Sequence, residues 1–215
     1  MTNEGELFKI YSDDLLEWNK KFNLTAIIAP EEIKTKHFED SLSLLKAIDL
    51  TDQSVIDIGA GAGFPGVPLK IKCPDIKLTL VEATKKKVEF LEHLVEALNL
   101  KDVEVIWGRA EEVAKDKREQ YDIAVSRAVA ELSTLSEWCL PFVKVGGLFV
   151  AYKTSNTESE IKKAEKAIEA LGGKIKEIKR LEVGIIKRSL IIIEKKAPTP
   201  ARFPRRPGIA KKRPL

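Results

Sequence analysis

A glycine-rich turn is the part of this sequence best suited to chemistry. Residues 57–66 read Asp-Ile-Gly-Ala-Gly-Ala-Gly-Phe-Pro-Gly, and they overlap a short apolar segment, residues 55–58, that has the pattern of a buried strand. Glycine adopts positive φ angles without strain and lets a ligand approach the backbone. In doubly wound α/β sheets, ligands bind outside the carboxyl ends of the strands, where the strand order switches. We therefore expect Gly61 and Gly63 to border a ligand site.

A carboxylate stands at the end of the next expected strand. Residues 77–81 are predominantly apolar, and Glu82 follows them directly. An acidic side chain at this position can accept hydrogen bonds from ribose hydroxyl groups. The turn and Glu82 together favour a ligand that contains a nucleoside.

The literal spacing of the glycines leaves alternatives open. Gly61, Gly63 and Gly66 spell GxGxxG, the dinucleotide fingerprint, which is a weak signal by itself. A nicotinamide-dependent oxidoreductase is therefore one alternative, and a tight turn that binds nothing is another. Against the oxidoreductase, the chain has no room for a second substrate domain and offers no obvious acid or base for hydride transfer after the sheet.

Two helices are expected before the first strand. Residues 7–22 place their large apolar side chains on one helical face. Pro30 suits the first turn of a second helix, which we expect to extend to Ile48. Because both helices precede the sheet, we interpret residues 1–50 as an N-terminal helical cap.

Strands and helices then alternate through residues 51–197. The expected strands are residues 55–58, 77–81, 103–107, 122–126, 148–152, 174–181 and 189–194. Helices are expected between the earlier strands, but none separates the last two, which should therefore pair antiparallel. The predicted fold class is α/β, with a doubly wound, mostly parallel, seven-stranded Rossmann-like sheet that has an antiparallel edge.

Composition restricts the class of protein. The chain has 215 residues, of which 44% are hydrophobic, a length and composition that suit one globular α/β domain. It contains no apolar run long enough to span a bilayer, and its first residues do not read as a signal peptide. Cys73 and Cys139 are isolated, without metal-ligand spacing. We expect a cytoplasmic monomer that binds neither a membrane nor a metal ion.

The positive charge is concentrated at the end of the chain. Residues 198–215 contribute +6 to a net charge of +4, which leaves −2 for the remainder. A basic tail of this kind indicates a nucleic acid or another anionic partner. The candidate RNA-binding residues of the tail are Arg202, Arg205, Arg206, Lys211, Lys212 and Arg213.

Six segments, in order along the chain, resemble the RsmG (GidB) family of ribosomal RNA methyltransferases. They are Asn23-Leu24-Thr25-Ala26-Ile27, His37-Phe38-Glu39-Asp40-Ser41-Leu42, residues 57–66, Gly108-Arg109-Ala110-Glu111, Ser126-Arg127-Ala128-Val129-Ala130 and Phe203-Pro204-Arg205-Arg206-Pro207-Gly208. The resemblance implies a methyltransferase sheet and S-adenosylmethionine as the methyl donor. It also implies N7 of a guanine in the 530 loop of 16S rRNA as the acceptor, presented by the RNA or by the small ribosomal subunit.

The resemblance also implies positions for the cofactor. Gly59 and Phe64 should lie against S-adenosylmethionine, and Ala110 and Glu111 should border its adenine. Arg127 should reach the cofactor or the target base. The family often has aspartate at the position of Glu82, but the longer side chain can still reach a ribose.

Methyl transfer to N7 makes modest demands on side chains. A sulfonium methyl group is already electrophilic and guanine N7 carries a lone pair, so no general base is required. A donor on N7 would block that lone pair, so a cation that reads guanine should contact O6 or phosphate instead. Arg127 and Lys153, each near a strand end, are our catalytic candidates. A carboxylate beside the cationic product, from Glu111 or Asp40, is a further hypothesis.

The tryptophans and one further functional alternative remain to be interpreted. Trp18, Trp107 and Trp138 occupy core-like positions, and we assign them to packing. A non-catalytic RNA-binding protein that kept the fold is the third functional alternative, beside the methyltransferase and the oxidoreductase.

Overall fold

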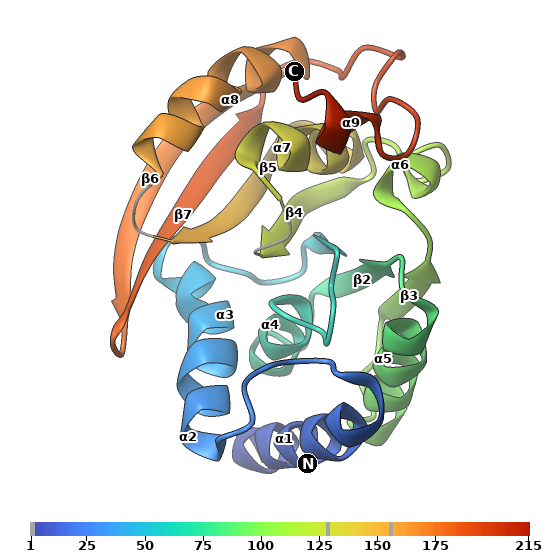
Figure 1. Cartoon of the computed structure of the whole chain (residues 1–215), viewed down its shortest axis with the longest axis vertical. Coiled ribbons are helices and arrows are strands. Elements are labelled where there is room, and N and C mark those ends of the chain that lie inside the picture. Colours follow the sequence, from blue (N-terminus) through green and yellow to red (C-terminus); the bar gives the residue numbers. More distant parts are fainter. Residues whose placement is uncertain (1–2, 128–129, 155–156) are drawn as a thin grey trace.

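A mixed sheet forms the centre of the protein (Figure 1). The computed structural model describes residues 3–127, 130–154 and 157–215, so Ala128 and Val129 of the segment 126–130 lie outside the described residues. Within them the sheet has seven strands in the order β3-β2-β1-β4-β5-β7-β6. Their bounds are β1 Ser54–Ile58, β2 Lys77–Glu82, β3 Val103–Trp107, β4 Tyr121–Arg127, β5 Val143–Thr154, β6 Gly173–Val183 and β7 Ile186–Lys195. The first five are parallel, whereas β7 is antiparallel to both β5 and β6, which confirms the predicted fold class.

The strand order reverses direction between β1 and β4. From β1, the chain first builds outward through β2 to β3, and then returns to the other side of β1 with β4 and β5. In the pairing of these two central strands, Asp57 lies opposite Val125. The connections leaving β1 and β4 therefore diverge to opposite sides, and a crevice is expected at their carboxyl ends.

Helices cover both faces of the sheet (Figure 1). Because successive strand residues point to opposite faces, Val55 belongs to one hydrophobic cluster and Ile56 to the other. The first cluster includes side chains from α1 (Glu4–Phe22), α4 (Gly66–Lys72) and α5 (Lys85–Ala97). The second includes side chains from α6 (Ala110–Val113), α7 (Leu132–Cys139), η3 (Leu140–Phe142) and α8 (Glu158–Ala170).

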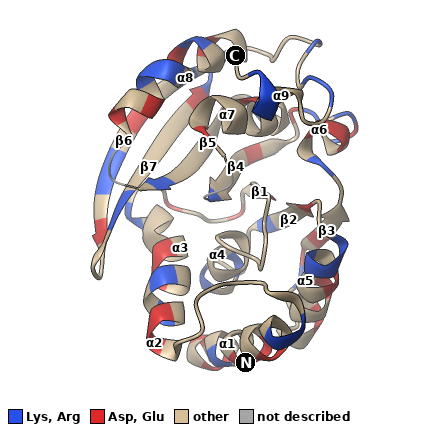
Figure 2. Ribbon diagram, viewed as in Figure 1, with Lys and Arg blue, Asp and Glu red and all other residues tan. Residues whose placement is uncertain are grey.

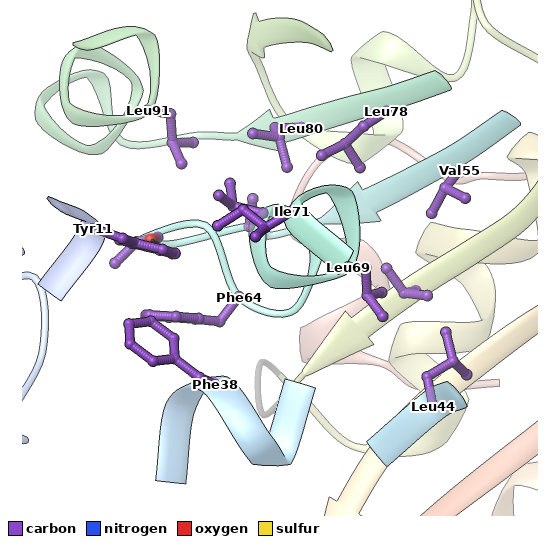
Figure 3. Packing of buried hydrophobic residues seen from close by; sticks show 14 of the residues in the cluster. Tyr11, Phe38, Leu44, Val55, Phe64, Leu69, Ile71, Leu78, Leu80 and Leu91 are labelled. Carbon is purple, nitrogen blue, oxygen red and sulfur yellow. Dashed lines mark hydrogen bonds between the residues drawn. The ribbon is translucent and has the colours of Figure 1, made fainter. Parts of the chain in front are cut away.

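The N-terminal cap shares its core with the sheet. Tyr11 of α1 is fully buried and its hydroxyl donates to the carbonyl of Ala62, at 2.6 Å, inside the glycine-rich turn. In Figure 3, the aromatic rings of Tyr11, Phe38 and Phe64 lie close together beside α4. The cap therefore positions the turn directly.

The second expected helix is interrupted. Between Pro30 and Lys46 the chain passes through α2 (Pro30–Ile33), a π-helix η1 (Lys34–Glu39), α3 (Asp40–Leu42) and a 3₁₀ turn η2 (Ser43–Lys46). A π-helix changes the direction of side chains relative to a regular α-helix and is often found at functional sites. Pro30 at the first turn predicts a helix here but does not reveal this irregularity.

The basic tail packs onto the body of the protein. Phe203 is buried in the second cluster, and Arg118 donates to the backbone carbonyls of Thr199, Pro200 and Phe203. The chain ends just after the short helix α9 (Ile209–Lys212), next to α7 (Figure 1). Among the described residues, the structure contains no helix with the length and apolarity needed to cross a membrane.

Candidate functional site

A cavity of about 460 Å³ opens at the carboxyl ends of β1, β2, β3 and β4. Its walls come from four parts of the chain that are far apart in the sequence. They are Leu24, Thr25 and His37 of the cap; Ile58, Gly59, Ala60, Gly61, Ala62 and Phe64 of the turn; Val81, Glu82, Ala83 and Lys87; and Gly108, Arg109, Ala110, Glu111, Arg127 and Trp138. Pockets for small ligands commonly enclose ~300–1,000 Å³.

The first two glycines of the turn face this cavity. Gly59 and Gly61 have φ angles of 74° and 62°, in the left-handed region that favours glycine. Gly59 N donates to the carbonyl of Val81 at 2.9 Å, which joins the turn to β2. A Cβ atom on Gly61 would meet only the carbonyl of Gly59, at 3.8 Å. A side chain at Gly61 would therefore extend into open space beside the turn.

The third glycine serves packing instead. Gly63 does not line the cavity, although the sequence pattern predicts a ligand contact for it. A Cβ atom on Gly63 would lie 2.7 Å from the Tyr11 hydroxyl and 2.9 Å from Val67. Gly63 thus lets the turn close against α1, and its contribution to the cavity is indirect.

Glu82 is held in place beneath the cavity by backbone groups. It is 7% exposed, and its two carboxylate oxygens accept from Gly61 N at 2.9 Å and from Thr84 N at 2.8 Å. Each oxygen keeps a lone pair for a further donor. A carboxylate fixed in this way at the end of β2 can accept hydrogen bonds from a pair of ribose hydroxyls.

Asp57 is a buried carboxyl group at the start of the turn. Oδ2 accepts from Gly66 N at 2.8 Å, whereas Oδ1 has no partner among the described atoms. Burial raises the pKa of Asp57 from 3.8 to about 7, opposed by the hydrogen bond from Gly66. The charge of this group is therefore sensitive to a ligand bound beside the turn.

Arg127 occupies the side of the cavity nearest to the cap. Its Nη1 donates to Asp40 Oδ2 at 2.9 Å, and its Cζ lies 5.0 Å from the centre of the Phe64 ring. Asp40 is fully buried and also accepts two hydrogen bonds from Arg188, at 2.6 and 2.8 Å. Because both oxygens of Asp40 are engaged, the hypothesis that it lies beside the product ring is not supported, and its role is to position Arg127.

His37 of the π-helix completes this side of the site. Its ring stacks on Phe64 with centroids 4.4 Å apart, and its Nδ1 lies 3.2 Å from Arg127 Nη2. Burial and, to a smaller extent, the positive charge of Arg127 lower the pKa of His37 to about 4. The side chain is therefore a neutral wall of the cavity. The family resemblance covers the segment that contains His37, but it implied no role for this side chain.

The opposite wall connects the cavity to the tail. Glu111 Oε1 accepts from Trp138 Nε1 and from Gly208 N, both at 3.1 Å. Ala110, Glu111 and Trp138 all line the cavity. The structure therefore places Ala110 and Glu111 in the wall of the same cavity as Glu82 and the turn, and Trp138 contributes to this wall in addition to its packing.

Lys153 is not part of this constellation. Its Nζ donates to the carbonyl of Ala130 and to Glu160 Oε1, each at 2.5 Å. It lines a separate, shallower hollow together with Tyr152 and Arg188. The structure thus separates Lys153 from Arg127, although both lie near the carboxyl ends of central strands, and this placement does not support a catalytic role for Lys153.

The basic residues of the tail fall into two groups. Arg205 is committed to Glu137, a side chain 1% exposed, and donates to it from the backbone N and from Nε and Nη2 at 2.6 to 3.1 Å. The cations exposed on the surface are Arg202, Arg206, Lys211, Lys212 and Arg213. Arg205 therefore anchors the tail, and the exposed group is available to an anionic partner.

Trp107 departs from the expectation of a packing role. It is 62% exposed, because it ends β3, the edge strand of the sheet. An alternating strand pattern predicts which face a residue occupies but not where a helix stops covering that face. Trp18 does pack against the core, as expected.

Comparisons with known proteins agree on one family. Residues 4–191 match the sequence model of the family described as rRNA small subunit methyltransferase G. Curated relatives called ribosomal RNA small subunit methyltransferase G include one from Alkaliphilus metalliredigens, 48% identical over 99% of this chain and 91% of the relative. Another, from Acetivibrio thermocellus, is 49% identical over 97% of this chain and 87% of the relative.

Solved structures share the fold at much lower identity. The structure of TYW2 from M. jannaschii in complex with AdoMet has a TM-score of 0.61 and 15% identity, over 79% of each chain. TrmN from Thermus thermophilus has a TM-score of 0.59 and 16% identity, over 72% of this chain and 48% of that one. At these identities the likeness establishes the fold of the sheet and its helices.

Proposed function

Since this chain belongs to the rRNA small subunit methyltransferase G family, we propose that it transfers a methyl group from S-adenosylmethionine to N7 of a guanine in the 530 loop of 16S rRNA. The observation that carries the proposal is the cavity at the switch in strand order. There Glu82, the turn and Arg127 come together from three strand ends.

The residues present fit S-adenosylmethionine. The fixed carboxylate of Glu82 suits the ribose hydroxyls, and the backbone at Gly59 and Gly61 leaves room for the ligand beside the turn. Ala110 and Glu111 form the wall assigned to the adenine. The buried Oδ1 of Asp57 has no hydrogen-bond partner among the described residues. The pKa of this carboxyl group is about 7, so a cationic ligand beside the turn would favour its charged form.

The protein's contribution to the chemistry is alignment. S-adenosylmethionine supplies, when bound, an electrophilic methyl group that needs no further activation. The turn and Glu82 hold the donor, while Arg127, fixed by Asp40 and stacked on Phe64, borders the space where a target base would lie. Holding two reactants in an attack geometry can contribute ~7–11 kcal/mol.

Arg127 must leave the attacking nitrogen free. Its Nη1 is committed to Asp40 and its Nη2 to His37. These contacts fix the orientation of the guanidinium, so that these two nitrogens are not directed at N7. The guanidinium can still offer its remaining N–H groups to guanine O6 or to a phosphate. Because His37 is neutral, it does not protonate N7 and adds no second positive charge beside Arg127.

The substrate and setting follow from the same proposal. The exposed tail cations Arg202, Arg206, Lys211, Lys212 and Arg213 contact rRNA phosphates, alone or in the small ribosomal subunit. In this proposal residues 1–50 form the N-terminal cap, residues 51–197 form the domain that binds the cofactor, and residues 198–215 contact the RNA. The enzyme acts as a cytoplasmic monomer.

Methyl transfer to small ribosomal subunits tests the proposal. Subunits from a strain that lacks the enzyme are incubated with labelled S-adenosylmethionine, and the expected result is one methyl group per 16S rRNA. Calorimetry with S-adenosylmethionine and with NADH accompanies the assay. Binding of NADH alone would favour an oxidoreductase, and cofactor binding without transfer to any rRNA would favour a non-catalytic RNA-binding protein.

A further inference from the structure

An exposed tryptophan stands at the rim of the cavity. Trp107 is 62% exposed, yet its ring does not move freely, because Nε1 donates to the carbonyl of Ala83 at 3.1 Å. Ala83 lines the cavity, as do Gly108 and Arg109, the two residues that follow Trp107. The indole therefore lies beside the mouth of the site, held by its edge.

One lysine lies over this ring, and other basic side chains line the cavity beside it. The Nζ of Lys85 lies over the ring, 5.8 Å from the centroid. Lys87 and Arg109 line the neighbouring cavity, and the lysines at the start of α5 form a positive band beside β3 (Figure 2). An aromatic surface next to cations matches the chemistry of a nucleobase on a phosphate chain. Proteins bind single-stranded nucleic acid by stacking bases on aromatic rings within such a positive groove.

We propose that Trp107 stacks an unpaired base of the RNA that flanks the target guanine, while Lys85 and its neighbours contact the adjoining phosphates. This inference rests on the proposed function, since it requires an RNA substrate. A target nitrogen can reach the cavity only from an exposed or splayed base, and stacking the next base on Trp107 would hold the strand open there.

The alternatives for Trp107 are a core role and a cofactor role. A core role conflicts with its exposure, and the indole is absent from the wall of the cavity, which separates it from the position given to the adenine. A base stacked on the ring accounts for its exposure at the rim of the cavity.

The test compares Trp107→Leu, which keeps apolar bulk but removes the flat ring, with Trp107→Phe, which keeps a smaller ring. Ile185→Ala is the control, because Ile185 is 91% exposed in the turn between β6 and β7. Binding is measured with a short oligoadenylate and with an abasic oligonucleotide of equal length. Affinity for S-adenosylmethionine reports on the fold of each variant.

Trp107→Leu is expected to weaken oligoadenylate binding about 5- to 150-fold, the range for removal of one base stack. Trp107→Phe should retain most of the affinity. Binding of the abasic probe, the salt dependence and the affinity for S-adenosylmethionine should all stay within twofold of wild type. Oligoadenylate should also quench the fluorescence of wild type but not of Trp107→Phe, whereas Trp18→Phe should still be quenched.

Equal oligoadenylate affinity for wild type and Trp107→Leu would overturn the inference. So would an equal loss for both probes, or a loss of S-adenosylmethionine binding in the Phe variant, since these identify a structural or cofactor role. The two proposals can fail separately. If wild type methylates rRNA while Trp107→Leu binds normally, only the stacking role is wrong; if wild type transfers no methyl group to rRNA, the proposed function is wrong.

Discussion

Arg127 Nη2 and His37 Nδ1 lie 3.2 Å apart, and this contact determines the state of the imidazole. Arginine can only donate, so Nδ1 must be the acceptor and the ring proton must lie on Nε2. There it can be donated to Thr25 Oγ1, 2.8 Å away. Protonating Nδ1 would place two cations against each other in a buried site. This contact connects the N-terminal cap to β4 at one side of the cavity.

His37 is therefore expected to stay neutral well below its usual pKa of 6.5. Its folded pKa, about 4, is depressed, so its contribution to stability is present above pH 6.5 and is lost as pH falls toward 4. Nitrogen-15 NMR of histidine-labelled protein should show the Nε2–H tautomer from pH 8 to pH 5. In Arg127→Ala the pKa should rise, because a neighbouring positive charge is gone. A His37 that titrates near 6.5 in wild type would contradict this geometry.

Methyl transfer should be sensitive even to the conservative replacement of Arg127 by lysine. We expect Arg127→Ala and Arg127→Lys each to lower kcat by about 10²-fold or more, the scale for losing one oriented donor. A lysine cannot stack a planar group on Phe64 while binding Asp40. Asp40→Asn should lower kcat less, because His37 and the Phe64 ring still constrain the guanidinium. Single-turnover rates separate these effects from RNA affinity. Wild-type rates in Arg127→Lys would remove the planar group from the mechanism.

Gly61 offers a test of the turn with a matched control. Gly61→Leu should abolish binding of S-adenosylmethionine, because the new side chain extends into the cavity. Gly146 also has a positive φ, 90°, and open space around it, but it lies in β5, away from the cavity. Gly146→Leu should therefore carry a similar backbone strain, ~1–2 kcal/mol, and still bind the cofactor. Calorimetry on both proteins decides, and retained affinity in Gly61→Leu would refute the assignment of the turn.

The tail should respond to point substitutions in two ways. Replacing Arg206, Lys211, Lys212 and Arg213 by glutamine should weaken RNA binding and flatten its salt dependence, by up to ~0.7 for each phosphate of a single strand that is no longer neutralised. Arg205→Ala should instead lower the free energy of unfolding, by about 2–3 kcal/mol. That is below the ~3–5 kcal/mol of a fully buried pair, because Arg205 is partly exposed while Glu137 is not. Denaturant titration and salt-dependent binding separate the two roles; an unchanged salt slope in the glutamine variant would make the exposed tail a bystander.

Deleting the whole tail would be a poor test of RNA binding, because the tail also contacts the cavity wall and the core. Gly208 N donates to Glu111, which lines the cavity, and Phe203 is part of the core. A truncation after Pro198 would disturb the cofactor site and stability along with RNA binding. Point substitutions at exposed cations avoid this ambiguity.

Sequence patterns predicted the sheet well because local rules and burial agree there. The apolar runs, the glycine turn and the missing helix before the last strand were enough to predict a mostly parallel sheet with an antiparallel edge. They also placed Glu82 and Arg127 at the carboxyl ends of two strands. The π-helix at His37 was not predictable, since it depends on tertiary packing of the cap.

The errors within the site have a common physical origin. Gly63 obeys the glycine pattern but faces Tyr11, and Lys153 lies near a strand end but contacts Glu160. Trp107 was assigned to packing but lies at an exposed edge of the sheet. In each case the sequence indicates the place of the residue along the chain, whereas its contacts depend on how the surrounding elements pack.

Mapping the modified nucleotide tests the central claim most directly. Small subunits from a strain that lacks the enzyme are treated with the purified protein and S-adenosylmethionine, and their 16S rRNA is digested and analysed by mass spectrometry. The account predicts one new 7-methylguanosine, located in the 530 loop and absent with Arg127→Ala. A methyl group on another atom or outside that loop, or none in the presence of bound cofactor, would contradict it.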